Sequence, residues 1–344
     1  DKQAGLNTAG YISGYRGSPL GGYDLQLEKN YKLLGESQII FQPGVNEDLA
    51  ATALWGTQQA EIRGEGKYDG IFGIWYGKGP GGDRSGDVLK HANHAGTSKF
   101  GGVLALMGDD HTAESSTLCS QSEFSMIDAM IPVLNPSGVQ DRYDYGIYGW
   151  ALSRYSGCLV GLKCLHDTVE STASINVDIN RLNVLLPEDY NIPEGGLNIR
   201  FPDTPNAQDE RMHLHKIEAV RAFSRVNKFD RTIWNGGDAK IGVISVGKSY
   251  LDTILALDEL GIEEKDSDRL GLRLYKVAMP WPLEDNGVVE FAKGLDLIIV
   301  VEEKRAIIEP QIKEILYETS SNPKVISKTD EKGNSTDSYT QLTP

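Results

Sequence analysis

The stretch IIFQPGVNEDLAATALWGTQQAEI, residues 39–62, decides the fold class of this 344-residue chain. A short apolar run comes first, then a loop with proline and glycine, and then a long helix-like segment. Asn46 is a good N-cap for that helix, and Glu47 and Asp48 place two carboxylates in its first turn. A strand, a loop and a helix in this order are the repeating unit of α/β proteins.

The same alternation extends from Tyr11 to about Thr172. Apolar runs such as YDGIFGIWYG, GGVLALMGDD and CLVGLKCL are separated by helix-like segments, and glycine or aspartate stands at the carboxyl ends of the runs. This pattern predicts an α/β fold with a mainly parallel sheet flanked by helices. Ligands of such sheets bind at the carboxyl ends of the strands, so the site is expected there.

A change in composition between about Asn176 and Arg211 indicates a linker, because proline, asparagine, aspartate and glycine replace the periodic pattern. After it, KIGVISVG, LRLYKVAMPWP and LDLIIVVEE are the strands expected of a second, smaller α/β unit. The expected organisation is a first domain over 1–178, a linker region with a helix over 179–239, a second domain over 240–330 and a polar tail over 331–344.

The charge and cysteine content exclude several classes of function. The 34 basic and 49 acidic residues give a net charge of −15 without basic clusters, which argues against a nucleic-acid partner. No apolar run reaches the roughly 18 residues of a membrane span, and no export signal is visible, so a cytoplasmic protein is expected. Because the chain begins at Asp1 without methionine, we also expect it to be a portion of a longer protein.

Two short motifs suggest nucleotide chemistry. GVISVGKS, residues 242–249, matches the phosphate loop of NTPases, but three of its residues are strand-forming and would leave no nest of free N–H groups. GKGPGG, residues 77–82, matches a dinucleotide fingerprint, but Pro80 removes a donor that a pyrophosphate needs. An NTPase and a nucleotide-dependent dehydrogenase remain as alternatives.

Histidine pairs do not predict a metal site. His91 and His94 share a helix-like segment, but no third ligand accompanies them at a diagnostic spacing. The three cysteines, at 119, 158 and 164, likewise have neither disulfide nor iron–sulfur spacing. His111 is a separate candidate, because it follows two aspartates at the carboxyl end of an expected strand.

The loop GYRGSPLGGYD, residues 14–24, is difficult to explain as scaffold, because four glycines let its backbone approach a ligand closely. With PGVNEDLAA, WYGKGPGGDRSGDVLKHANHAG and IPVLNPSG, it resembles the thiamine-diphosphate-dependent 2-oxoacid:ferredoxin oxidoreductases. The resemblance covers about residues 4–328 and is strongest to the long bacterial indolepyruvate ferredoxin oxidoreductase form. It implies a domain that binds the cofactor's pyrimidine, followed by a unit similar to the transketolase C-terminal domain.

The resemblance also implies roles for individual residues. Glu47 matches the family glutamate that hydrogen-bonds N1′ of the pyrimidine and thereby lets the cofactor's 4′-nitrogen remove the proton from C2. On local physics alone, this carboxylate would only stabilise the helix start, by roughly 0.3 to 1 kcal/mol. Gly17 is expected at the cofactor, and Ser18 stands where a family hydroxyl contacts the substrate carboxylate.

Arg16 replaces a proline that is usual in the family loop. It is expected either to bind the substrate carboxylate or to form a surface salt bridge. The arginine that pairs with the substrate acid in the pyruvate enzymes has no match here. Lys99 and His111 are candidates to replace it, and His111 is the one expected at the substrate.

The implied reaction is the oxidative decarboxylation of a 2-oxoacid, such as the aryl pyruvate indolepyruvate, to the acyl-coenzyme A, with electrons passed to ferredoxin. The family's metal motif and cysteine clusters do not occur, so Mg²⁺ and [4Fe-4S] clusters are expected from other segments or partner chains. A symmetric homo-oligomer is expected. A regulatory or assembly subunit of the same fold, without catalytic activity, is the alternative from another class.

Overall fold

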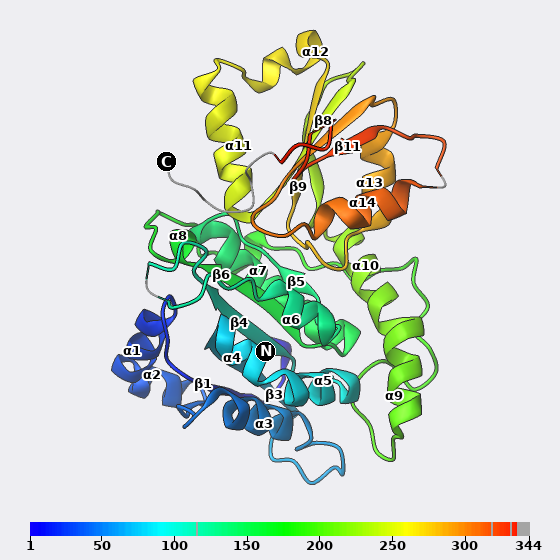
Figure 1. The fold of residues 1–344 in the computed structure, drawn as a ribbon. Coiled ribbons are helices and arrows are strands. Elements are labelled where there is room, and N and C mark those ends of the chain that lie inside the picture. The colour runs from blue at the N-terminus through cyan, green and yellow to red at the C-terminus, as the bar shows by residue number, and fades with distance from the viewer. Residues whose placement is uncertain (115, 318, 331, 336–344) are drawn as a thin grey trace.

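The first sheet occupies the amino-terminal half of the computed structural model, which describes residues 1–114, 116–317, 319–330 and 332–335 (Figure 1). Its strands lie in the order β2-β1-β3-β4-β6-β5 and are all parallel. The predicted parallel α/β sheet is therefore confirmed. The strands are β1 (Thr8–Gly14), β2 (Ile39–Phe41), β3 (Gly70–Lys78), β4 (Val103–Asp109), β5 (Val133–Leu134) and β6 (Val160–Leu165).

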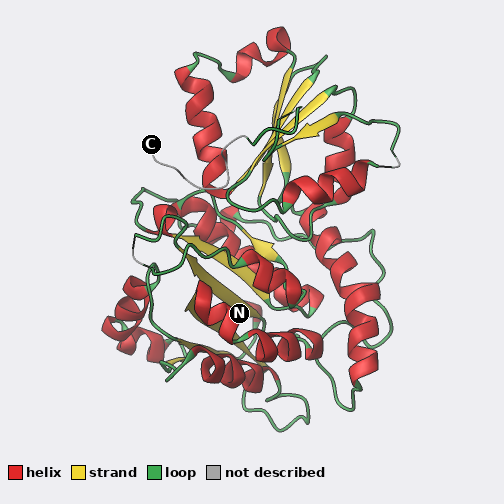
Figure 2. Cartoon of the chain, viewed as in Figure 1, coloured by secondary structure: helices red, strands yellow, loops and turns green. Residues whose placement is uncertain are grey.

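Helices cover both faces of this sheet (Figure 2). In β4, Leu104 and Leu106 belong to one core and Val103, Ala105 and Met107 to another, because successive side chains point to opposite faces. The helices of this unit are α1 (Gly21–Lys29), α2 (Tyr31–Glu36), α3 (Glu47–Gln58), α4 (Gly79–Arg84), α5 (Gly86–Ala95), α6 (Glu123–Asp128), α7 (Val139–Ser156) and α8 (His166–Val169).

The connecting segment combines irregular chain with a helical part. One short 3-10 turn of this segment lies at Ile179–Arg181. Two others lie elsewhere in the chain, at Lys2–Ala4 and Glu264–Asp266. The helical part of the connecting segment packs on α7 and on the core of the first sheet, as Phe223 of α10 does with Tyr155 of α7. It contains α9 (Pro205–Arg211), a π-helical turn (Met212–Lys216) and α10 (Ile217–Val226).

The second sheet has the strand order β11-β10-β8-β9-β7, with β7 antiparallel to β9 and the other pairs parallel. Strand β7 lies in the stretch that the sequence analysis assigned to the linker. The strands are β7 (Arg231–Asn235), β8 (Ile241–Val246), β9 (Leu272–Val277), β10 (Leu297–Val301) and β11 (Lys324–Ile326). The helices are α11 (Gly247–Glu259), α12 (Ser267–Leu270), α13 (Asp285–Ala292) and α14 (Ile308–Leu316).

The two sheets meet along the carboxyl edge of the first one. Val133 and Asn135 donate backbone hydrogen bonds to Trp281 and Ala278 of the second unit, at 2.8 Å each. Figure 1 shows the loops that follow β4 and β5 beneath the second unit. The second unit therefore covers part of the edge at which ligands of parallel sheets bind.

Candidate functional site

The loops after β1 and β2 place α3 above the carboxyl edge of the first sheet. The Gly44 N–H donates to the carbonyl of Gly14 at 2.8 Å, which ties the second loop to the end of β1. A Cβ at Gly44 would lie 2.7 Å from the Asn46 carbonyl oxygen, so a side chain does not fit there. Because β2 and β3 lie on opposite sides of β1, this edge is a point where the strand order reverses, the usual ligand position.

Glu47 is the first residue of α3, and two contacts fix its backbone. The Asn46 side chain caps the helix by accepting from the Leu49 N–H at 2.9 Å, as predicted. The buried indole of Trp75, in β3, donates from Nε1 to the Glu47 carbonyl at 3.1 Å. The position of this helix start is therefore determined by a strand of the sheet as well as by its own cap.

The carboxyl group of Glu47 lies against the start of α4. A Cβ at Gly81 would approach its Oε1 to 2.6 Å, and a Cβ at Gly77 would lie 3.4 Å from its Cγ. Glu47 is only 9% exposed, yet its carboxylate has no hydrogen bond to any part of the chain that the structure describes. These oxygens are not among the fully enclosed side-chain atoms that lack a partner, so a donor from solvent or from a ligand can reach them.

The glycines of GKGPGG have a different role from the one that the dinucleotide motif suggests. Gly79, Gly81 and Gly82 lie in α4 directly after β3, and two of them make room for a side chain of the edge. Gly81 makes room for Glu47, and Gly79 makes room for Ser120, whose Oγ would lie 2.4 Å from a Cβ. These glycines therefore allow close packing around the Glu47 carboxylate.

The glycine-rich loop after β1 lies at the same edge. A Cβ at Gly17 would be 3.1 Å from Cδ of Lys78, the last residue of β3, and Pro19 packs on Gly108 of β4. Ser18 is half-buried and Arg16 is exposed. The structure thus brings Arg16, Gly17 and Ser18 to the edge where Glu47 lies, and their contacts to substrate and cofactor stay predictions.

His111 follows β4, and both of its ring nitrogens are engaged inside the protein. The Lys163 ammonium can only donate, so Nε2 accepts from it at 3.0 Å and Nδ1 donates to the Ser120 carbonyl at 2.9 Å. Burial, together with the nearby ammonium, holds the pKa of His111 far below its ordinary value. His111 is therefore neutral, and its expected contact with the substrate stays a prediction.

Lys163 is buried among acidic groups of both units. Its Nζ lies 2.6 Å from Glu123 and 3.9 Å from Asp109, while Glu303 of the second unit lies 3.7 Å from His111. Burial raises the pKa of Asp109 to about 6, and Lys163 opposes that rise. Sequence analysis missed this network, although a lysine inside the apolar run CLVGLKCL was a signal for it.

The other histidine and lysine candidates lie away from this edge. Lys99 precedes β4 and is therefore at the amino edge of the parallel sheet, where its ammonium lies 5.3 Å from the Phe100 ring. His91 stacks on Trp55, and His94 contacts the Lys90 carbonyl in α5. Lys99 is thus on the wrong side of the sheet to replace the missing substrate-binding arginine.

Metal-binding clusters and membrane-spanning helices are both absent from the residues that the structure describes. No group of three or more histidine, cysteine, aspartate or glutamate side chains there could hold a metal ion. No helix there is both long and apolar enough to span a membrane.

Comparison with protein families and curated proteins gives consistent results. Residues 231–341 match the model of the indolepyruvate oxidoreductase domain. Indolepyruvate oxidoreductase subunit IorA of Pyrococcus horikoshii is 26% identical over 238 residues, which cover 66% of this chain and 34% of that protein. IorA of Thermococcus kodakarensis is 28% identical over 229 residues, which cover 63% of this chain and 33% of that protein. The chain thus spans about a third of the length of these relatives.

Solved structures show a similar fold. A 2-oxoglutarate:ferredoxin oxidoreductase from Magnetococcus marinus, with 2-oxoglutarate, coenzyme A and succinyl-CoA bound, superposes with a TM-score of 0.62 at 16% identity. The match covers 93% of this chain and 59% of that one. A split-gene transketolase, in an inactive β4 tetramer, gives a TM-score of 0.53 at 11% identity over 92% and 82% of the chains.

Proposed function

This chain belongs to the thiamine-diphosphate-dependent 2-oxoacid:ferredoxin oxidoreductase family, and we propose that it supplies the pyrimidine half of the cofactor site. The reaction proposed for the whole enzyme is oxidative decarboxylation of a 2-oxoacid, with an aryl pyruvate such as indolepyruvate as the substrate. We assign the pyrimidine half to residues 1–178 and the transketolase C-terminal-like unit to residues 240–330.

The observation that carries this proposal is the Glu47 carboxylate, which is nearly buried and has no hydrogen-bond partner among the described residues. It lies at the point where the strand order reverses, and glycines leave space around it. A donor such as protonated N1′ of an aminopyrimidine would satisfy it. The residues present therefore fit the pyrimidine end of thiamine diphosphate.

Thiamine diphosphate, when bound, supplies the carbon nucleophile and the electron sink for decarboxylation. The chain's own contribution is to hold a proton between Glu47 and N1′ and to keep that carboxylate in place through Trp75 and Gly81. Ser18 and Arg16, on the neighbouring loop, are proposed to orient the substrate carboxylate, with Gly17 against the cofactor. His111 contributes by holding the loop that ends at Ser120.

The remaining parts of the reaction are proposed to come from elsewhere in the assembly. The described residues offer no metal cluster, so Mg²⁺ for the diphosphate and the [4Fe-4S] clusters would come from other segments or partner chains. Coenzyme A, a ferredoxin-type acceptor and a second copy of the chain complete the proposed assembly. The three cysteines are free, in keeping with a proposed cytoplasmic setting.

The experiment compares Glu47→Gln with Asp48→Asn in the assembled enzyme. Both variants remove one carboxylate from the first turn of α3, and Asp48 is the exposed one, paired with Arg84 at 3.3 Å. Turnover of phenylpyruvate should fall by about 10²- to 10⁴-fold in Glu47→Gln and by less than about threefold in Asp48→Asn. Equal, small effects in both variants would favour a regulatory subunit without catalytic activity.

Mass spectrometry of the small molecules released from the purified enzyme tests the remaining alternative, a nucleotide-dependent dehydrogenase. Thiamine diphosphate is expected in parent and in both variants. A nicotinamide dinucleotide in its place would favour the dehydrogenase interpretation and overturn the proposal.

A further inference from the structure

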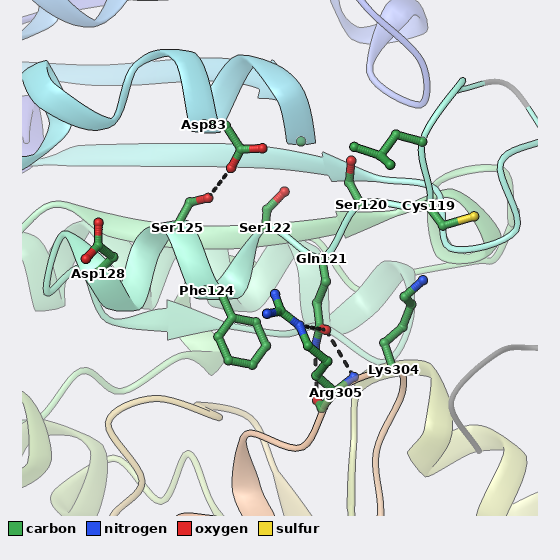
Figure 3. A pocket seen from close by; sticks show the side chains of 12 residues that line it. Asp83, Cys119, Ser120, Gln121, Ser122, Phe124, Ser125, Asp128, Lys304 and Arg305 are labelled. Carbon is green, nitrogen blue, oxygen red and sulfur yellow. Dashed lines mark hydrogen bonds between the residues drawn. The ribbon is translucent and has the colours of Figure 1, made fainter. Parts of the chain in front are cut away.

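A cleft of about 570 Å³ lies between the two units, beside the proposed cofactor site. Its walls come from the start of α4, from the segment around α6 and from a loop of the second unit. In Figure 3, Lys304 and Arg305 rise from the second unit, while Ser120, Ser122 and Ser125 lie on the opposite wall. The cleft therefore exists only where both units are in place.

The cations of this cleft are not neutralised by the acids that line it. Asp83 accepts a hydrogen bond from Ser125, and Asp128 is paired with Lys90 at 2.6 Å. Within the described part of the chain, neither Lys304 nor Arg305 has an acidic group within 4.0 Å. Lys304 is half-buried and Arg305 is exposed, so both cations are available to an anion that enters the cleft.

Arg305 is held in place by contacts that leave the end of its guanidinium free. Its Cζ lies 3.6 Å from the centre of the Phe124 ring, and its Nε and backbone N–H both donate to Gln121 Oε1. The Gln121 amide donates in return to the Arg305 carbonyl at 3.1 Å. The two terminal nitrogens make no hydrogen bond within the described residues, so they can bind a planar or tetrahedral oxyanion.

The first turn of α4 lies between the cleft and the Glu47 carboxylate. Gly79 lines the cleft, and Gly81, two residues later in α4, contacts Glu47. Ser120 lies on the same wall, and its hydroxyl has no hydrogen-bond partner among the described residues. A ligand that entered the cleft would thus approach the proposed pyrimidine position from the side of the second unit.

We infer that Lys304 and Arg305 bind an oxyanion of a reactant in this cleft: the carboxylate of the 2-oxoacid or a phosphate of coenzyme A. The inference rests on the proposed function, because both reactants belong to that reaction. It assigns the second unit a direct part in reactant binding and adds a candidate cation for the substrate acid to Arg16 of the first unit. The two reactants share the chemistry that the cations recognise, and experiment can separate them.

Cys119 provides a direct test, because this exposed cysteine lines the cleft whereas Cys158 and Cys164 are buried. The assembled enzyme, without electron acceptor, is treated with iodoacetamide, and alkylation of Cys119 is followed by mass spectrometry. The probes are phenylpyruvate and, separately, desulfo-coenzyme A, which has no thiol. One of the two probes should slow alkylation of Cys119 at least about fivefold in the parent enzyme. In the double variant Lys304→Gln/Arg305→Gln the same probe should slow it less than about twofold, because a lost charged hydrogen bond weakens binding about tenfold or more.

Steady-state kinetics give the second measurement. The same double variant should raise KM about tenfold or more for the reactant that protects Cys119, with kcat changed less than about threefold. Lys304→Arg keeps both charges and leaves the stacked Arg305 in place, so this variant should stay near parent. Arg84→Gln, which removes a cation outside the cleft, should also leave both KM values near parent. The hydrogen bonds between the backbone of residue 305 and the Gln121 side chain persist in all of these variants.

Absence of protection by both probes, with unchanged KM for both reactants, would overturn the inference. That result would leave the proposed function intact if Glu47→Gln still lost turnover. Protection by phenylpyruvate identifies the carboxylate as the ligand, and protection by desulfo-coenzyme A identifies the phosphate.

Discussion

The carboxyl group of Glu47 and the α-carbon of Gly81 are in such close contact that a methyl group at position 81 would come within 2.6 Å of Oε1 and of Cγ. Glu47 begins α3, and Gly81 lies in the first turn of α4, 34 residues later in the sequence. The contact means that the orientation of the proposed catalytic carboxylate depends on the absence of a side chain at one position of the neighbouring helix.

Gly81→Ala should therefore displace the carboxylate and reduce turnover by about 10²-fold, because misplacement by about 1 Å can cost that much. Gly82→Ala is the matched control in the same helix, since a Cβ there meets only Met126 Cε, at 3.7 Å. The control should keep parent-like turnover and gain stability, up to about 1 kcal/mol, because alanine is the better helix former. Equal turnover in the two variants would show that the contact does not position the carboxylate.

Lys248→Ala tests the apparent phosphate loop. Val243, Ile244 and Val246 pair with neighbouring strands, so this part of the motif has no nest of free N–H groups. Lys248 is paired with Asp252 one turn later, at 2.7 Å. The substitution should change turnover by less than about threefold, because such helical pairs contribute only about 0.3 to 0.5 kcal/mol. Measurable ATP binding by titration calorimetry in the parent, lost in the variant, would restore the NTPase interpretation.

The pH dependence of stability tests the buried network at the contact of the two units. Burial raises the pKa of Glu303 to about 7, from an ordinary value of 4.5, while Lys163 and Lys248 oppose the rise. The folded state therefore binds this proton more tightly than the unfolded state does. The stabilisation is fully present below about pH 4.5 and is lost as the pH rises through about 7.

The contribution of Glu303 to the melting temperature should accordingly fall between about pH 4.5 and about pH 7 and change little above that. Glu303→Gln should flatten this fall, because the amide does not ionise. Glu290→Gln, which removes an exposed partner of Lys293 from the same unit, should keep the parent profile. Differential scanning calorimetry at three pH values provides the measurement, and an unchanged slope in Glu303→Gln would contradict the assigned titration.

The first sheet was predictable because its central strands β4 and β6 are buried along their whole length and lie between glycine-rich or acidic loops. Strand β7 was missed for a physical reason: it is an edge strand of which only Trp234 is buried, and a register shift separates Thr232 from Trp234. Its pairing with β9 is a contact between segments about 40 residues apart, which local periodicity does not reveal.

The site was predictable only where its signal is local. Asn46 and Glu47 form a helix start that can be recognised in the sequence. Two other features depend on how helices and units pack. They are the contact of Glu47 with Gly81 and the hydrogen bonds between Gln121 and Arg305, which are 184 residues apart. Local patterns thus predicted the helix start at Glu47, the family resemblance supplied the role expected of its carboxylate, and tertiary packing determines what surrounds it.

Exchange of the C2 proton of bound thiamine diphosphate with deuterium is the most direct measurement of the proposed role of Glu47. The exchange is followed on the assembled enzyme by acid quench and NMR, in the absence of substrate, for parent, Glu47→Gln and Asp48→Asn. If Glu47 holds the proton at N1′, exchange should slow by about 10²-fold or more in Glu47→Gln and stay parent-like in Asp48→Asn, with the cofactor bound in all three. Parent-like exchange in Glu47→Gln would contradict the account and leave this carboxylate with the helix-capping role alone.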